Sequence, residues 1–190
     1  RKIQEGCNNR CHYCTIPSIR GNLTSRPAED ILMEFRWLLE RGYREINIIG
    51  QDITSYGTDR NRKETLAGLV GSLLNEKGDF YLRLLYMHPK GITGELLDVM
   101  CSDPRIIPYL DIPIQHCEDR ILSLMGRGHT KTYLEGLLTM MRERMPGAAL
   151  RTSIIVGFPS ETDKEFENLL SFLGMYPFDM LGAFRYAREE

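Results

Sequence analysis

Three cysteines near the start of the sequence have the types and spacing that most clearly indicate chemistry. Cys7, Cys11 and Cys14 form a C-x3-C-x2-C pattern, whereas Cys101 and Cys117 stand alone. Thiolates at this spacing can bind three irons of a [4Fe–4S] cluster and leave the fourth iron open. Five cysteines, an odd number, fit metal binding better than a framework of disulfides. The pattern predicts that Cys7, Cys11 and Cys14 are metal ligands beside a site for a chelating small molecule.

A structural zinc site is the alternative interpretation, with His12 or a distant residue as fourth ligand. Structural zinc usually occupies paired CxxC or Cys/His knuckles, and the sequence contains no second pair. We expect Cys101 and Cys117 to be partly buried thiols rather than ligands. The spacing therefore favours a cluster over zinc.

An alternating α/β chain must position these cysteines. Short apolar runs alternate with segments of helical periodicity, and right-handed crossovers curl a parallel sheet, which predicts a partial (β/α)6 TIM-like barrel. The predicted strands are 1–5, 45–49, 80–86, 109–114, 149–156 and 180–186. The predicted helices are 27–41, 64–76, 93–101, 118–125, 131–145 and 161–175.

Polar or glycine-containing segments follow the first five predicted strands. In a parallel α/β barrel, catalytic groups lie at the carboxyl ends of the strands. We therefore expect these segments to meet at one rim, where His88 and His116 are candidate substrate contacts, although a hydrogen-bonded rim histidine is the simpler interpretation of each. The segments are the cysteine loop, Gly50-Gln51-Asp52, Met87-His88-Pro89, Gln115-His116 and Gly157-Phe158-Pro159.

Composition sets further limits. The 190 residues are 42% hydrophobic and carry a formal net charge of −2, which suits one domain over 1–190 without the basic excess of nucleic-acid-binding domains. The sequence has no apolar run of roughly 20 residues and no signal region, so we expect a cytoplasmic protein without a membrane segment. Because Arg1 rather than Met comes first, we expect flanking domains in a longer polypeptide.

The motifs together resemble the methylthiotransferase branch of the radical S-adenosylmethionine (SAM) family. Tyr13 precedes the last cysteine, as the aromatic residue does in the C-x3-C-x-Φ-C signature of that family. The resemblance implies that the three cysteines hold a [4Fe–4S] cluster that cleaves SAM to a 5′-deoxyadenosyl radical. The other motifs that carry the resemblance, in the expected order and along essentially the whole chain, are Ile16 to Gly21, Ser25 to Pro27, Gly50 to Asp52, Asp111 to Gln115 and Ile155 to Glu161.

The same resemblance implies which residues contact SAM. Tyr13 would lie near the adenine, and Gly50 to Asp52 near the amino group, although a core aromatic and an ordinary turn are the alternatives. Independently of the resemblance, Arg151 would share the inward face of an apolar strand, where it needs an anion such as the SAM carboxylate. The alternative is an arginine at a strand end that reaches solvent or an internal Glu. Ser153 stands where the family's GxIxGxxE-like element begins with glycine, so only three backbone positions of that element carry over. The predicted cofactor-binding residues are Tyr13, Gly50, Gln51, Asp52, Gln115, Arg127, Arg151, Ile155, Val156 and Gly157.

Three local features are similar to the branch that modifies an aspartate β-carbon in a small-subunit ribosomal protein. They are Gln51-Asp52 followed by Tyr56 to Asp59, Leu84 to Tyr86, and Gln115-His116. The implied partners are that ribosomal protein and an electron donor such as flavodoxin. The family also has an N-terminal domain that holds a second cluster and a C-terminal TRAM domain. A tRNA adenosine methylthiotransferase, for which tRNA would be the substrate, is the less favoured alternative, and a non-catalytic metal-binding scaffold is another.

Overall fold

Across the described residues, six parallel strands follow one another in chain order. The computed structural model describes residues 1–60 and 64–188. β3 pairs with β4, β5 with β6, and β6 with β7, and single parallel bridges, Lys2 to Ile49 and Leu82 to Ile106, link the remaining neighbours. The strands are β1 (Gln4–Glu5), β3 (Glu45–Ile48), β4 (Tyr81–Leu84), β5 (Tyr109–Asp111), β6 (Ala149–Val156) and β7 (Met180–Arg185).

Helices make the crossovers that parallel strands require. Four of them begin at a threonine whose hydroxyl accepts a backbone N–H in the first turn: Thr65, Thr93, Thr130 and Thr162. This cap satisfies a donor that the helix itself leaves unpaired. The helices are α2 (Ala28–Glu40), α3 (Leu66–Leu74), α4 (Gly94–Ser102), α5 (Asp119–Leu124), α6 (Lys131–Arg144) and α7 (Asp163–Met175).

Every predicted strand and helix is present, which confirms the partial (β/α)6 barrel. The strand predicted to end at residue 86 ends at Leu84 because Tyr86 has a left-handed φ of 64°. Four short elements were not predicted, since two to five residues are too few for a periodic pattern. They are α1 (Ile16–Arg20), β2 (Thr24–Ser25), which pairs antiparallel with β1, and the 3-10 turns η1 (Ile53–Ser55) and η2 (Pro89–Gly91).

One apolar core lies between the strands and the helices. Alternate residues of β3 and β4, such as Ile48 and Leu82, are buried, as expected where successive side chains point to opposite faces. Phe35 of α2 meets Phe80 edge to face, with ring centroids 5.0 Å apart. The core thus fixes the strands and leaves their carboxyl ends to the loops.

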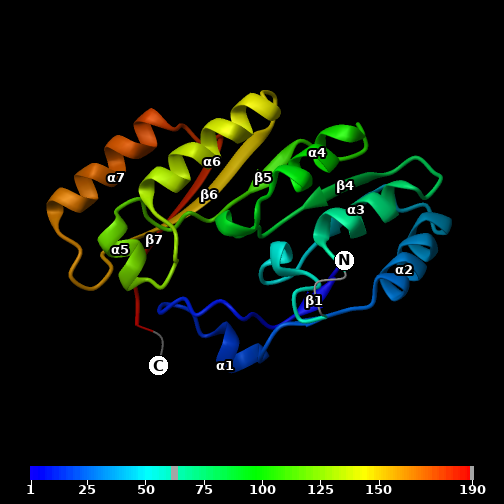
Figure 1. Cartoon of the computed structure of the whole chain (residues 1–190), viewed down its shortest axis with the longest axis horizontal. Coiled ribbons are helices and arrows are strands. Elements are labelled where there is room, and N and C mark those ends of the chain that lie inside the picture. The colour runs from blue at the N-terminus through cyan, green and yellow to red at the C-terminus, as the bar shows by residue number, and fades with distance from the viewer. Residues whose placement is uncertain (61–63, 189–190) are drawn as a thin grey trace.

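The barrel is open at β7. Within the described residues this strand pairs only with β6, and its side chains are largely exposed. In Figure 1, α6 and α7 lie on one side of β6 and β7, and α1 lies across from them on the other side. None of the helices in the described ranges is long and apolar enough to cross a membrane.

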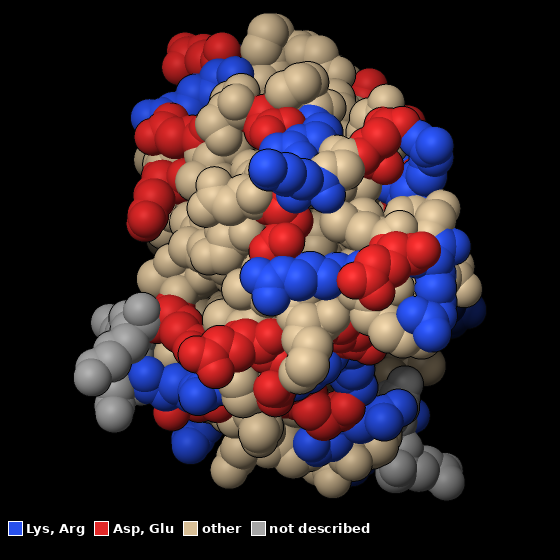
Figure 2. Space-filling view, turned by 90° about the vertical axis from the view of Figure 1, so that its right-hand side faces the viewer, with Lys and Arg blue, Asp and Glu red and all other residues tan. Residues whose placement is uncertain are grey.

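Charges of both signs are mixed on the surface that bears α2. Figure 2, which views the right-hand side of Figure 1, shows Lys and Arg side chains interspersed with Asp and Glu. Arg36 of α2, for example, pairs with Glu76 at 2.7 Å. This face therefore presents no extended basic surface.

Candidate active site

A cavity of about 170 Å³ lies where the cysteine loop meets the carboxyl ends of the strands. Segments after β1, β3, β4 and β5 contribute to it, as the rim prediction requires, together with Arg127 after α5. The segment after β6 does not, because Val156 and Gly157 line a separate hollow beside α7. The residues that line the cavity are Cys7, Asn9, Cys11, Tyr13, Cys14, Ile16, Gln51, Asp52, Tyr86, Met87, His88, Pro113, Gln115 and Arg127.

All three cysteines of the motif reach this cavity as free thiols. Cys7 is buried, and this burial raises the pKa of its thiol. The loop is folded on itself by Cys14 N–H, which donates to Cys11 O at 3.1 Å, and by Cys7 N–H, which donates to Gly21 O at 3.2 Å. Within residues 1–60 and 64–188, no three His, Cys, Asp or Glu side chains are grouped so as to hold a metal ion. The assignment of the cysteines as cluster ligands stays a prediction.

Asp52 ties three loops together. Its buried carboxylate accepts hydrogen bonds from Asn9 Nδ2 at 2.7 Å, from Thr54 N–H at 3.1 Å and from His88 N–H at 3.3 Å. These bonds cap η1 and join the cysteine loop to the segments after β3 and β4. The neighbouring Gln51 Oε1 is buried and has no hydrogen-bond partner among the described residues. Gln51 is therefore the member of this segment with an acceptor left to offer a ligand.

Gly50 has a packing role beneath the cavity. A Cβ at this position would lie 2.8 Å from Gln4 Cγ, closer than carbon atoms pack. The Gln4 side chain donates from Nε2 to Asp52 O at 2.5 Å. Gly50 thus makes room for the residue that supports Asp52 and does not itself line the cavity.

Tyr86 and Gln115 line the cavity with strained backbones. Their φ angles are 64° and 70°, in the left-handed region that non-glycine residues rarely adopt. Tyr86 N–H donates to the buried Asp111 carboxylate at 3.3 Å, and Gln115 N–H donates to Ser153 O at 2.9 Å. Strain of this kind persists where surrounding contacts hold it, and it gathers at functional sites.

Arg127 lines the cavity and contacts the cysteine loop. Its Nη2 donates to Pro113 O at 2.6 Å, and its Nη1 lies 3.3 Å from Tyr13 Oη and 3.6 Å from Cys11 Sγ. Tyr13 also packs against the buried pair Ile121 and Met125. Both interpretations of Tyr13 are therefore compatible with its position, because the residue lines the cavity and contacts core side chains.

Arg151 lies on β6 outside the cavity lining. Its Nη1 is 3.5 Å from Oδ2 of Asp111 on the neighbouring strand. Burial raises the pKa of Asp111, and Arg151 acts in the opposite direction. An internal acid therefore supplies an anion for Arg151, while a contact with SAM stays a prediction. Ile155 packs beside Tyr13 in the apolar cluster that contains Phe158.

Three histidines, His88, His116 and His129, are held neutral by their surroundings. Burial and the positive charge of Arg127 lower the pKa of His88 to about 3 and that of His129 to about 4. His116 is fully buried, with Nε2 3.3 Å from Oε1 of Glu161, and burial lowers its pKa as well. His116 is thus a hydrogen-bonded interior residue, and only His88 of the two rim candidates lines the cavity.

Asn9, Tyr86 and Pro113 belong to the cavity but were absent from the predicted site residues. Asn9 lies inside the cysteine loop, and Pro113 lies inside the Asp111 to Gln115 motif, so both were close to recognised signals. Tyr86 belongs to the Leu84 to Tyr86 feature named from the sequence, but its place in the cavity had no local signal, because its conformation depends on the long-range hydrogen bond to Asp111.

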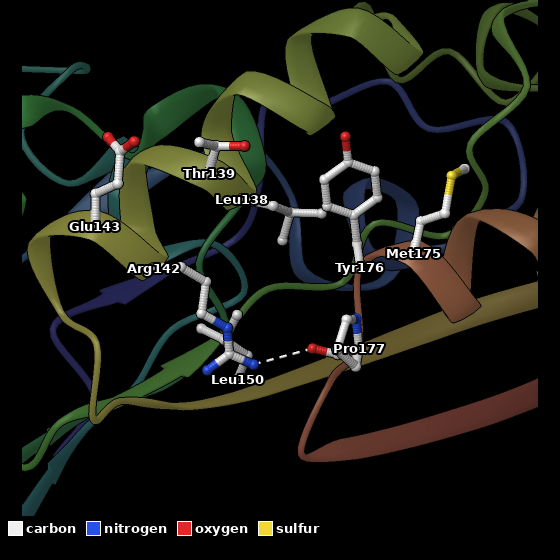
Figure 3. A pocket seen from close by; sticks show the side chains of 8 residues that line it. All are labelled: Leu138, Thr139, Arg142, Glu143, Leu150, Met175, Tyr176 and Pro177. Atoms are coloured by element: carbon white, nitrogen blue, oxygen red, sulfur yellow. Dashed lines mark hydrogen bonds between the residues drawn. The ribbon is translucent and has the colours of Figure 1, made fainter.

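A larger cavity, of about 430 Å³, lies away from the cysteines between α6, α7 and the start of β6. Figure 3 shows Arg142 across it, with a hydrogen bond to Pro177 O at 2.9 Å. Arg142 also pairs with Asp179. Leu150 places the cavity at the amino end of β6, the end of a barrel that serves stability rather than catalysis. We therefore attribute this cavity to packing.

Comparisons with known proteins find relatives that match the whole chain. Ribosomal protein uS12 methylthiotransferase RimO of Dictyoglomus thermophilum is 48% identical over 189 residues, covering 100% of this chain and 43% of the relative. The protein of that name from Geobacter sulfurreducens is 48% identical over 189 residues, covering 100% and 42%. The chain therefore spans less than half the length of these relatives.

Solved structures of lower identity share the fold. TsrM of Kitasatospora setae, a radical SAM methyltransferase solved with cobalamin and a [4Fe–4S] cluster, has a TM-score of 0.76 at 17% identity over 97% of this chain and 36% of its own. Coproporphyrinogen III oxidase HemN of Escherichia coli has a TM-score of 0.66 at 18% identity, over 98% and 43%. The model of the Radical SAM superfamily matches residues 2–173. With that match over the barrel and its cysteine loop, the chain belongs to the radical SAM superfamily.

Proposed function

We propose that this chain is the catalytic core of a radical SAM methylthiotransferase that acts on an aspartate of ribosomal protein uS12. The observation that carries the proposal is 44–48% identity along 99–100% of the chain to proteins named uS12 methylthiotransferase RimO. The cavity at the carboxyl ends of the strands, with three thiols on its wall, supports the chemistry.

The residues fit a [4Fe–4S] cluster and SAM. Cys7, Cys11 and Cys14 provide the thiols, and two buried polar atoms at the same cavity, Gln51 Oε1 and Arg127 Nε, lack partners among the described residues. Buried polar atoms without partners are costly, so a polar ligand at this place accounts for them. When bound, the cluster supplies the electron that cleaves SAM.

The chain's own residues would orient SAM and keep water away. Ile16, Met87 and Pro113 add apolar surface to the cavity, and exclusion of water protects a reactive intermediate from side reactions. Asp52 holds the loops in register because its carboxylate accepts hydrogen bonds from Asn9, Thr54 and His88. Gln115 and Tyr86, fixed in strained conformations, form part of the cavity wall.

We propose that the residues predicted from the sequence to contact SAM do so. Tyr13, Gln51, Asp52, Gln115 and Arg127 are supported by their place on the cavity wall. Support is weaker for Gly50 and Ile155, since neither lines the cavity. Gly50 packs against Gln4, and Ile155 packs against the apolar cluster that Tyr13 also contacts. Arg151, Val156 and Gly157 lie outside the cavity lining. They would contact SAM only where part of the SAM molecule extends beyond the cavity.

Anaerobic reconstitution with iron and sulfide tests the cluster. We expect about one [4Fe–4S] cluster per chain from three thiolates, and its loss when any one of Cys7, Cys11 and Cys14 is replaced by Ala. The matched control is Cys101→Ala, which should keep the cluster. With dithionite as electron donor, SAM should yield 5′-deoxyadenosine and methionine. Stoichiometric binding of zinc without uptake of iron and sulfide would instead support a metal-binding scaffold.

The substrate is tested in the full-length protein. We expect a methylthio group on uS12 by mass spectrometry and none on tRNA, since the composition has no basic excess. An electron donor such as flavodoxin, flanking cluster and TRAM domains, and a cytoplasmic location follow from the same proposal. A methylthio group on tRNA adenosine, with uS12 unmodified, would contradict this proposal and assign the chain to the tRNA-modifying branch.

A further inference from the structure

The end of α5 and the turn that follows it bind the cysteine loop through hydrogen bonds. We call residues 124–127 the α5 clasp. Backbone N–H of His12 donates to Met125 O at 3.0 Å, and His12 Nδ1 lies 2.6 Å from Leu124 O. Two consecutive carbonyl groups at the carboxyl end of a helix thus bind one residue in the middle of the cysteine motif.

Gly126 brings the two backbones together. Its φ of 71° lies in the left-handed region, and a Cβ here would lie 2.6 Å from Arg10 O. Glycine is therefore required both by conformation and by the close approach of the cysteine loop. The α5 clasp is fitted to the residues between the first and the second cysteine as well as to His12.

Arg127 is the last residue of the α5 clasp, and it brings a buried positive charge to the motif. Its side chain is shielded from solvent, and its donors reach Cys11 Sγ, Tyr13 Oη and Pro113 O. Among the described residues it has no carboxylate partner, and its Nε has no acceptor. A buried cation without a counter-charge is unfavourable, so this position calls for an anion.

A [4Fe–4S] cluster with three thiolates supplies that anion. Its net charge is negative and becomes more negative when one electron is added. A cation beside a ligand sulfur stabilises the reduced cluster more than the oxidised one, and hydrogen bonds to sulfur also tune the potential. Arg127 therefore favours the reduced state.

We infer that Arg127, the last residue of the α5 clasp, raises the reduction potential of the cluster bound by Cys7, Cys11 and Cys14. The inference rests on the proposed function only in requiring the cluster. It adds a role for Arg127 that is separate from any contact with SAM, because the guanidinium meets the ligand sulfur itself.

An anaerobic potentiometric titration, with dithionite as the one-electron donor and EPR of the reduced cluster as readout, tests this role without SAM. At a fixed potential, Arg127→Gln should lower the ratio of reduced to oxidised cluster about tenfold, which is about 59 mV for a one-electron couple. Arg127→Lys keeps the charge and should shift the ratio less. The matched control is Arg120→Gln in α5, the helix that precedes Arg127, where Arg120 is exposed and pairs with Glu165. It should leave the ratio unchanged.

Gly126→Ala tests the α5 clasp with the charge retained. The added Cβ should displace the cysteine loop, so the loaded chain should lose iron to a chelator faster than the unaltered chain does. Equal ratios in the Gln variant and the unaltered chain, at equal iron and sulfide content, would overturn the inference and leave the proposed function intact. Failure of the unaltered chain to take up any cluster would overturn both.

Discussion

At the scale of single residues, hydrogen bonding decides which polar groups of the cavity are free for a ligand. Asp52 lines the cavity, yet its carboxylate already accepts from Asn9, Thr54 and His88. Gln51 has a buried acceptor with no partner in the described ranges. Gln51 is therefore better suited than Asp52 to receive the SAM amino group, and Asp52 is better suited to hold the loops together.

Variants of the Arg151–Asp111 pair distinguish a structural role of Arg151 from a role in SAM binding. Arg151→Met leaves the buried Asp111 carboxylate without its cation, so we expect a loss of about 1–3 kcal/mol in the free energy of unfolding. Asp111→Asn in the same chain should restore much of it, which urea unfolding of the two single variants and the double variant measures. If Arg151 also binds the SAM carboxylate, the double variant regains stability but not SAM affinity. Recovery of both would confine Arg151 to a structural role.

His129 predicts a pH dependence of stability. Its pKa is about 4 in the folded chain and 6.5 is the ordinary value, so the unfolded chain binds a proton more readily. The contribution is fully present above pH 6.5 and is lost as the pH falls toward 4. At pH 5 the loss is about 2 kcal/mol relative to pH 7.5. Urea unfolding at both values should show a smaller pH effect in His129→Asn, and an equal effect would contradict the assignment.

At the scale of elements, the short connections carry the site, and the long helices and strands support it. The cysteine loop has no regular structure of its own between β1 and α1, and it is held by Gly21, by the α5 clasp and by Asp52 through Asn9. Each of these contacts comes from a different part of the chain. The loop's shape therefore depends on the assembled barrel.

Gly6 lies where the chain passes from β1 into the cysteine loop, and its replacement tests whether this turn needs glycine. Its φ is 68°, and a Cβ here would collide with Asn22 O. Gly6→Ala should lower the free energy of unfolding by about 1–3 kcal/mol through backbone strain, and it should reduce cluster uptake. The matched control is Gly136→Ala in α6, where a Cβ meets nothing within 4 Å and stability should rise by about 1 kcal/mol. Thermal unfolding and iron content distinguish the two, and equal behaviour would refute the role of Gly6.

At the scale of the whole molecule, the barrel is incomplete and the surface near β7 is apolar. Met180, Leu181 and Phe184 of this strand are 44–57% exposed. The chain spans 40–44% of the length of the relatives that share 46–48% identity with it. We therefore expect the complete activity to require more of the polypeptide than these 190 residues.

Isolated and reconstituted, the chain should cleave SAM but not transfer a methylthio group. Only three of its five cysteines form a cluster motif, so no second cluster is available to provide sulfur. Slow release of 5′-deoxyadenosine with dithionite, measured by chromatography, together with unmodified uS12 by mass spectrometry, is the expected result. Methylthiolated uS12 from this chain alone would contradict it.

The sequence by itself determined the architecture and the cysteine motif. Apolar periodicity located every crossover helix and every parallel strand, because burial of one face is a local property of a segment. The C-x3-C-x2-C spacing placed three thiols in one short loop for a similar reason, and all three line the cavity. Four of the five rim segments expected from strand ends met at the cavity.

Only the tertiary structure decided how the polar residues pair. Arg127 lies more than 100 positions along the chain from Cys11 and Tyr13, yet its guanidinium contacts both. Arg151 finds Asp111, and Tyr86 is held in a left-handed conformation by the same carboxylate. Side-chain pairing of this kind depends on which loops the packed barrel brings together. No local pattern of residues encodes which distant side chains will be neighbours.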